Sequence, residues 1–196
     1  MTEPYAIAPP SPWVRRFASL ITAGGTVLDV ACGTGRHTAL FAETGFRVTA
    51  IDRDISRLEH NPLTLNRAGP LPAPTGVEAI EADLEGDAPW PLPGRSFDGI
   101  VVANYLYRPL LPVLIDSLTP GGVLIYETFA VGNERFGRPR NPDFLLRDGE
   151  LLDAVAGELS VVAYEFGEVA IPAPAIVQRI AAVRRAAAIP VIPPPV

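Results

Sequence analysis

Short apolar runs rich in β-branched residues alternate along this chain with longer stretches of helical periodicity. Such alternation is typical of a mostly parallel sheet covered by helices, because each parallel connection needs a crossover segment. The apolar runs predict five strands, over residues 26–30, 47–51, 77–82, 97–104 and 123–129. The stretches between them predict helices over residues 12–21, 35–44, 110–118 and 148–158, and a further helix from residue 55 that Pro62 interrupts. The pattern therefore predicts an α/β fold.

Glycine and proline mark the ends of these elements, and the last two apolar runs break the alternation. Ser11 and Pro12 fit the N-cap and first position of the first helix, and Gly45 fits the C-cap of the second. Residues 161–168 and 176–184 are joined by a proline-containing segment too short for a crossover helix. We therefore expect these two runs to form an antiparallel hairpin at the sheet edge, which makes seven strands.

Length and composition bound the class of protein. The chain has 196 residues, 48% hydrophobic and 19% charged, which suits one globular domain. Prolines gather at both ends, so we expect one domain over residues 11–186 between flexible tails at 1–10 and 187–196. No apolar run reaches the roughly 20 residues of a membrane helix, and the start has no signal-peptide layout. The expected location is the cytoplasm, with no membrane partner.

The ionisable residues exclude several kinds of chemistry. Cys32 is the only cysteine and there are two histidines, so neither a disulfide nor a metal site is expected. All 16 cationic residues are arginine, which removes Schiff-base lysine chemistry and the lysine of a P-loop. The net charge of −6 argues against a broad nucleic-acid-binding face.

A glycine-rich turn is the sharpest feature of the sequence. Residues 27–35 read V-L-D-V-A-C-G-T-G, a strand that runs into a turn of small residues and then a helix. Such a turn brings backbone N–H groups close to a ligand, because glycine adopts positive φ and has no side chain in the way. Asp52 and Asp83 end the next two strands, where one carboxylate suits ribose hydroxyls and the other an adenine amino group. A nucleoside site is therefore predicted in the crevice at these strand ends.

The turn does not fit a dinucleotide. A G-x-G-x-x-G motif needs a third glycine, but the sequence has Thr38 in one register and Arg36 in the other. Asp29 also points a carboxylate into the turn, which repels a pyrophosphate and suits an ammonium or sulfonium group. We therefore expect a cationic nucleoside rather than a nicotinamide cofactor.

The turn and four later segments together resemble one enzyme family. At residues 29–35, D-V-A-C-G-T-G resembles the first motif of the class I S-adenosylmethionine-dependent methyltransferases, with Ala31 in place of the first glycine. The later segments are E-A-D-L at 81–84, W-P-L-P at 90–93, F-D-G-I-V-V-A-N at 97–104 and L-T-P-G-G-V-L at 118–124. The resemblance spans about residues 12–185 and implies a Rossmann-like three-layer sandwich with a seven-stranded, mostly parallel sheet and an antiparallel C-terminal hairpin. It also implies the cofactor S-adenosyl-L-methionine.

The resemblance further implies roles for individual residues. Asp29 would lie near the methionine ammonium group of the cofactor, and Asp52 would hold its ribose hydroxyls. Arg53 would flank the adenine, Asp83 would accept its amino hydrogen, and the backbone of Asn104 would lie near the methionine moiety. The complete implied cofactor site is Asp29, Ala31, Cys32, Gly33, Thr34, Gly35, Asp52, Arg53, Asp83, Leu84 and Asn104.

The methyl acceptor is less well specified. Methyl transfer from a sulfonium can be driven by positioning and desolvation, so no catalytic acid or base is identified. The N-P-P-Y signature of amino methylation on bases or glutamine is absent, since residues 104–109 read N-Y-L-Y-R-P. His37 is expected to cap or pack the start of its helix rather than act as a base. The candidate acceptor-binding residues are Tyr105, Arg108, Glu127, Arg138 and Arg140.

An arginine-rich segment follows the fifth predicted strand. Arg135, Arg138, Arg140 and Arg147 lie close together in an acidic protein. Guanidinium groups bind carboxylates, phosphates and other oxyanions through paired hydrogen bonds. This segment and its neighbours resemble small bacterial methyltransferases grouped with tellurite-resistance-type enzymes. We therefore hypothesise a small anionic acceptor; an acceptor in tRNA or rRNA, and a non-catalytic cofactor-binding subunit of a complex, stay open as alternatives.

Overall fold

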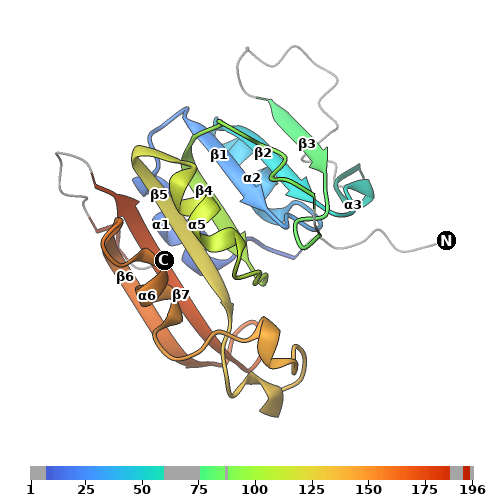
Figure 1. Cartoon of the computed structure of the whole chain (residues 1–196), viewed down its shortest axis with the longest axis vertical. Coiled ribbons are helices and arrows are strands. Elements are labelled where there is room, and N and C mark those ends of the chain that lie inside the picture. Colours follow the sequence, from blue (N-terminus) through green and yellow to red (C-terminus); the bar gives the residue numbers. More distant parts are fainter. Residues whose placement is uncertain (1–7, 60–75, 87, 186–191, 195–196) are drawn as a thin grey trace.

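The computed structural model describes residues 8–59, 76–86, 88–185 and 192–194, which form one seven-stranded sheet in the order β3-β2-β1-β4-β5-β7-β6 (Figure 1). The strands are β1 (Thr26–Val30), β2 (Arg47–Asp52), β3 (Val77–Glu81), β4 (Phe97–Ala103), β5 (Leu118–Phe129), β6 (Leu159–Val169) and β7 (Ala175–Arg184). Strands β1 to β5 pair in parallel, and β7 runs antiparallel to both β5 and β6. The predicted sheet and its C-terminal hairpin are thus confirmed.

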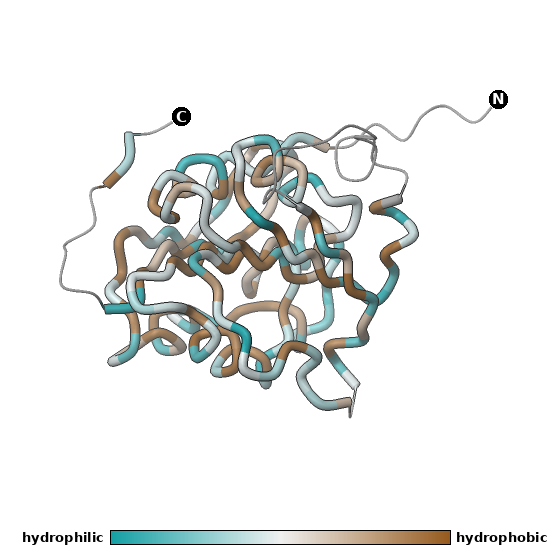
Figure 2. The backbone as a smooth tube through the Cα atoms, turned by 90° about the horizontal axis from the view of Figure 1, so that it is seen from above, coloured by the Kyte–Doolittle hydropathy of each residue, from teal (hydrophilic) through white to brown (hydrophobic). Residues whose placement is uncertain are grey.

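Helices cover both faces of the sheet. They are α1 (Pro12–Phe17), α2 (Arg36–Glu43), α3 (Ser56–Glu59), α5 (Leu110–Asp116) and α6 (Glu150–Val155), with short 3₁₀ turns η1 (Ala18–Leu20), η2 (Asn133–Arg135) and η3 (Pro142–Phe144). Leu28 of β1 packs with Leu114 of α5, whereas its neighbour Val27 packs with Phe17 of α1 and Phe41 of α2. Alternate strand residues therefore bury against opposite helical layers, and Figure 2 shows the hydrophobic stretches running through the middle layer.

The connections diverge at the centre of the sheet. From β1 the chain passes to β2 and β3, and then it returns to β4 on the other side of β1. The carboxyl ends of β1 and β4 are therefore neighbours whose following loops turn apart, which opens a crevice between them. Ala31 follows β1 with φ 52° and Asn104 follows β4 with φ 59°. These are the described non-glycine residues with positive φ, a conformation that costs a residue with a Cβ about 1–2 kcal/mol.

Several element ends differ from those expected. Strand β5 begins at Leu118 rather than at residue 123, because Phe97 of β4 pairs with Leu118 and donates its N–H to the carbonyl of Ser117, at 2.8 Å. The preceding helix therefore ends at Asp116 instead of 118. Helix α1 ends early and continues as η1, and α6 is shorter than the predicted 148–158. The interruption at Pro62 and most of both predicted tails lie outside the described residues.

Arg108 fastens the segment after β5 to the domain. Its Nε lies 2.6 Å from Oε1 of Glu150 in α6, and its Nη2 lies 3.0 Å from Oε2 of the same side chain. The guanidinium also donates to the backbone carbonyls of Asp143 and Leu145, at 2.7 and 2.8 Å. One side chain thus ties together the β4–α5 loop, the segment that contains η3 and the first turn of α6.

His37 joins the first two helices. The N–H of Ser11, the N-cap of α1, donates to Nε2 of His37 at 3.1 Å, while the Ser11 hydroxyl accepts the N–H of Trp13 at 3.1 Å. His37 is buried, and burial lowers the pKa of its imidazole to about 3. The expectation that His37 packs the start of its helix is confirmed, since the neutral ring is the acceptor that holds α1 in place.

Replacing His37 by glutamine should make the protein less sensitive to acid. The unfolded chain binds a proton on His37 below pH 6.5 but the folded chain does not, so folding stability falls as the pH falls toward 3. The Gln oxygen can still accept the Ser11 N–H and does not titrate. Between pH 7.5 and 4.5 we expect the wild type to lose about 2–3 kcal/mol more than His37→Gln. Urea unfolding at both pH values measures this, and equal losses would contradict it.

Removing the Arg108 side chain should destabilise the domain more than removing an exposed arginine. In Arg108→Ala the Glu150 carboxylate keeps its hydrogen bond from the N–H of Arg147, at 2.8 Å, and two carbonyls lose the Arg108 donor. We expect a cost of about 2–3 kcal/mol in the free energy of unfolding. Arg135→Ala is the control, because Arg135 and Glu168 form an exposed pair at 3.5 Å worth at most about 0.5 kcal/mol. Similar costs for both variants in chemical denaturation would argue against the clamp.

Candidate functional site

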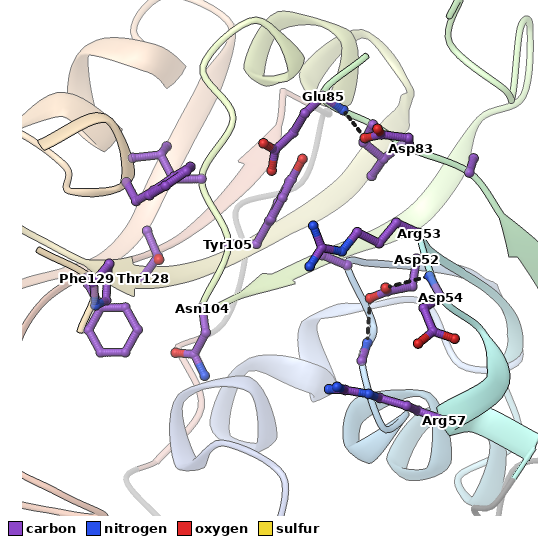
Figure 3. A pocket seen from close by; sticks show the side chains of 17 residues that line it. Asp52, Arg53, Asp54, Arg57, Asp83, Glu85, Asn104, Tyr105, Thr128 and Phe129 are labelled. Atoms are coloured by element: carbon purple, nitrogen blue, oxygen red, sulfur yellow. Dashed lines mark hydrogen bonds between the residues drawn. The ribbon is translucent and has the colours of Figure 1, made fainter. Parts of the chain in front are cut away.

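A cavity of about 530 Å³ opens at the carboxyl edge of the sheet, and Figure 3 shows it from close by. This size is usual for small-molecule and cofactor sites. The ends of β1 to β5 and the segment after β5 supply its walls. The lining residues are Ala31, Gly33, Asp52, Arg53, Asp54, Arg57, Ala82, Asp83, Leu84, Glu85, Asn104, Tyr105, Leu106, Thr128, Phe129, Pro139 and Phe144.

The glycine turn forms the wall of the cavity beside β1. Gly33 and Gly35 have φ of 55° and 74°, and a Cβ built on Gly33 would meet no protein atom within 4 Å. The backbone of Gly33 is therefore accessible from the cavity. Its N–H donates to Oδ2 of Asp52 at 2.8 Å, a contact drawn as a dashed line in Figure 3. The turn after β1 and the carboxylate after β2 thus meet, as the sequence predicts.

The carboxylates on the β2 and β3 side are held in fixed directions. Asp52 accepts the N–H of Asp54 through Oδ1 at 3.1 Å, and Asp83 accepts the N–H of Glu85 at 2.9 Å. In Figure 3 the Tyr105 side chain, which follows β4, extends toward Glu85. Burial and the negative charge of Glu85 raise the pKa of Tyr105 above its ordinary value, so the phenol is neutral. This half of the cavity is rich in hydrogen-bond acceptors, and its four carboxylates outnumber the two arginines, Arg53 and Arg57, that line the same cavity.

Asp29 and Cys32 lie behind the glycine turn. Asp29 is 1% exposed and accepts the hydroxyl of Thr38 at 2.6 Å. Burial raises the pKa of the Asp29 carboxyl to about 6, against a smaller lowering by the Thr38 hydrogen bonds. Burial also raises the pKa of the Cys32 thiol, which keeps it protonated and unreactive. Ionisation of the buried Asp29 carboxyl lowers the stability of the folded protein unless a cation lies close to it.

The structure brings most of the predicted cofactor residues to one cavity. Those in its lining are Ala31, Gly33, Asp52, Arg53, Asp83, Leu84 and Asn104. The other predicted residues of the glycine turn, Asp29, Cys32, Thr34 and Gly35, are outside the lining. They belong to the same turn and to the strand before it, so the whole predicted set occupies one end of the sheet.

The predicted acceptor residues are divided among different places. Tyr105 lines the cavity, whereas Arg108 is held by Glu150 as described above. Glu127 was expected to face the crevice if Tyr126 faces the core. Tyr126 is indeed buried in the core, but Glu127 lies outside the cavity lining, with its Oε2 3.4 Å from Nε of Arg179 in β7. The two residues that follow Glu127 in β5 line the cavity in its place.

Several lining residues escaped the sequence analysis. They are Asp54, Arg57, Ala82, Glu85, Leu106, Thr128, Phe129, Pro139 and Phe144. Asp54, Glu85 and Thr128 each lie within two residues of a predicted position, so widening each strand-end motif would have found them. Phe144 had no such signal, because it reaches the cavity only through the folding of the long segment after β5.

A second cavity of about 420 Å³ adjoins the first. It is lined by Arg138, Pro139, Arg140, Asn141 and Phe144, and it shares Pro139 and Phe144 with the first cavity. Arg138 and Arg140, both predicted from the sequence, therefore lie next to the cofactor candidates but beyond a shared wall. Figure 1 shows this segment, in orange, at the end toward which β5 points.

Two structural absences concern the described part of the chain. In residues 8–59, 76–86, 88–185 and 192–194, no group of three or more His, Cys, Asp or Glu side chains is arranged to hold a metal ion. Within the same ranges, no helix has the length and apolar character needed to cross a membrane.

Comparison with known proteins identifies the domain. Residues 27–122 match a family model described as a methyltransferase domain, and no curated protein sequence matches the chain. Among solved structures, TehB from Haemophilus influenzae is 16% identical with a TM-score of 0.67, over 86% of this chain and 60% of TehB. The N-methyltransferase NodS from Bradyrhizobium japonicum is 18% identical with a TM-score of 0.63, over 90% of this chain and 99% of NodS.

A third solved structure bears on the cofactor. The glycopeptide N-methyltransferase MtfA, solved with S-adenosyl-L-homocysteine, is 19% identical with a TM-score of 0.61, over 90% of both chains. At these identities the structural matches establish the fold, and the matched domain covers the glycine turn and both strand-end aspartates. Residues 27–122 are therefore a methyltransferase domain, and the fold of the chain is that of S-adenosylmethionine-dependent methyltransferases.

Proposed function

We propose that this methyltransferase transfers the methyl group of S-adenosyl-L-methionine to a small anionic acceptor bound between the two cavities. The observation that carries the proposal is the separation of charge across the shared wall. Four carboxylates and two arginines, Arg53 and Arg57, line the first cavity and leave it with an excess of negative charge, whereas Arg138 and Arg140 line the second without any acidic residue. This arrangement is complementary to a cationic donor on one side and an anionic acceptor on the other.

The residues of the first cavity fit the cofactor. Gly33 has no side chain, and the space beside its backbone is therefore open to a ligand. A larger residue would fill that space. Asp52 offers carboxylate oxygens for two ribose hydroxyls, Asp83 an oxygen for the adenine amino group, and Asp29 a buried negative charge behind the turn. We assign these roles together with the other residues implied for the cofactor site, because all of them gather at this end of the sheet.

The protein contributes positioning rather than acid–base chemistry. When bound, S-adenosyl-L-methionine supplies an electrophilic methyl group, whose C–S bond breaks as a lone pair of the acceptor forms the new bond. Thr128, Phe129 and Phe144 line one side of the cavity in which this exchange would take place. Arg138 and Arg140 would hold the far end of the acceptor, so that two bound molecules meet in a fixed direction.

The other interpretations receive less support from the residues. An RNA acceptor would need a basic path around the cleft, but in the lining of the first cavity four carboxylates outnumber two arginines. A non-catalytic subunit would not need a second, oppositely charged cavity beside the cofactor residues. Small-molecule acceptors are therefore the class we favour.

Asp52→Asn should remove most of the affinity for S-adenosyl-L-homocysteine. The amide keeps the size of the side chain but loses the charge and one acceptor oxygen for the ribose. We expect dissociation constants at least about 30-fold higher by calorimetric titration, since two charge-assisted hydrogen bonds weaken. NADH serves as the control ligand, and Asp116→Asn, on the exposed surface of α5, as the control variant. Unchanged affinity in Asp52→Asn would disprove the assigned site.

Asp29→Asn should change stability and cofactor affinity in opposite directions. Because the folded pKa is raised to about 6, the stabilising contribution of Asp29 is present below its unfolded pKa and is lost as the pH rises through 6. Relative to the wild type, the variant should gain about 2 kcal/mol of stability between pH 4.5 and pH 8. At pH 8 it should bind S-adenosyl-L-homocysteine more weakly, because the ammonium group loses its counter-charge.

Thermal unfolding and titration calorimetry on the same samples separate these two effects. A purely structural role of Asp29 predicts higher stability and unchanged affinity. Weaker binding together with higher stability is the result expected from a residue retained for the cofactor.

A further inference from the structure

The wall between the two cavities is apolar. Pro139 and Phe144 line both cavities, and Phe144 is 42% exposed. On the first side this strip continues into Phe129 at the end of β5. On the second side it is flanked by Arg138 and Arg140. A molecule that reaches from the first cavity to the guanidinium groups must therefore lie across an apolar surface.

The two arginines of the second cavity pair with no carboxylate in the part of the chain that the structure describes. By contrast, Arg135, which precedes them in the same segment, is paired with Glu168, and Arg108 of the β4–α5 loop is paired with Glu150. Arg140 donates through Nε to the carbonyl of Gly137 at 3.3 Å. No acidic residue lines the second cavity. In a protein of net charge −6, this leaves a local positive site open to an external oxyanion.

The segment that carries these arginines is held in place before any ligand binds. Asn133 is 1% exposed, donates through Nδ2 to the carbonyl of Pro139 at 3.4 Å and accepts the N–H of Ile176 at 3.2 Å. On the C-terminal side of the arginines, the Asn141 side chain accepts the N–H of Asp143 at 3.1 Å, and Arg108 donates a hydrogen bond to the Asp143 carbonyl. Anchors on both sides lower the ordering cost of binding.

We propose that the acceptor is an organic anion in which an apolar segment separates the methyl-accepting atom from a carboxylate or phosphate group. The oxyanion binds Arg138 and Arg140, the apolar segment lies on Pro139 and Phe144, and the accepting atom enters the first cavity. This inference rests on the proposed function and adds the class of its substrate. An inorganic oxyanion does not belong to this class of acceptor, because such an ion has no apolar part to lie on Pro139 and Phe144.

Three probes separate the contributions of charge and apolar surface. They are 4-hydroxyphenylacetate, which has both features, 4-hydroxyphenylacetamide, which lacks the charge, and acetate, which lacks the ring. Each is titrated by calorimetry into protein saturated with S-adenosyl-L-homocysteine, so that no turnover is needed. The variants are the double substitution Arg138→Gln with Arg140→Gln, and the control Arg135→Gln in the same segment.

We expect 4-hydroxyphenylacetate to bind at least about tenfold more tightly than either of the other probes, the effect of one desolvated charge-assisted contact. The double variant should remove the difference in affinity between 4-hydroxyphenylacetate and 4-hydroxyphenylacetamide. Arg135→Gln should leave it within about twofold, because Arg135 is paired with Glu168 outside the second cavity. Phe144→Ala should lower the affinity for 4-hydroxyphenylacetate toward that for acetate, while S-adenosyl-L-homocysteine still binds.

Other outcomes overturn the inference in distinguishable ways. If acetate binds as tightly as 4-hydroxyphenylacetate, the second cavity is a simple anion site. If 4-hydroxyphenylacetamide binds as tightly as 4-hydroxyphenylacetate, the site does not recognise the charge. Binding of S-adenosyl-L-homocysteine without any of the three probes would reject the acceptor class and leave the proposed function standing. No binding of S-adenosyl-L-homocysteine would reject the proposed function itself. If a single-stranded RNA decamer alone binds, with a steep salt dependence that the double variant abolishes, the acceptor is a nucleic acid.

Discussion

The parallel pairing of β1 with β4 is the contact on which the site depends. Residues 27–30 lie beside residues 99–102, and the chain leaves the two strands in opposite directions across the sheet. Gly99 leaves room for the side chain of Ile21, which packs over this strand pair, since a Cβ at Gly99 would clash with it. Because the two loops diverge, the left-handed residues Ala31 and Asn104 stand on either side of one opening. The cofactor cavity is a consequence of strand order as much as of side chains.

Two buried titratable groups illustrate how stability and function compete near this opening. His37 is neutral and holds α1 against α2, so its burial favours folding at neutral pH and opposes it in acid. Asp29 has the opposite pH dependence, because its buried carboxyl resists ionisation. The first arrangement is structural and needs no ligand. The second is unfavourable in the free protein at neutral pH, and under the proposed function a bound cation would offset this cost, which is a common trade-off at functional sites.

Arginine has at least three distinct uses in this lysine-free chain. Arg108 is an internal clamp whose partners lie 35 to 42 residues away. Arg179 lies between strands, with Glu127 on one neighbour and Glu165 on the other. Arg138 and Arg140 have no such acidic partners among the residues described and line a cavity instead. The same side chain therefore serves folding where a carboxylate lies opposite it, and we propose that it serves ligand binding at Arg138 and Arg140.

The sequence by itself determined the order of strands and helices, the antiparallel hairpin, the glycine turn and the acids at the ends of β2 and β3. These features depend on local periodicity and on turn residues a few positions apart, so they are legible without coordinates. Tertiary structure decided which residues at the end of β5 face the cavity: Glu127 pairs with Arg179, about 50 residues later, and Thr128 and Phe129 line the cavity. It also decided that Arg108 is a clamp and that Phe144 joins two cavities. Those outcomes depend on partners distant along the chain, whose positions only the packed sheet and the folded segment after β5 bring together.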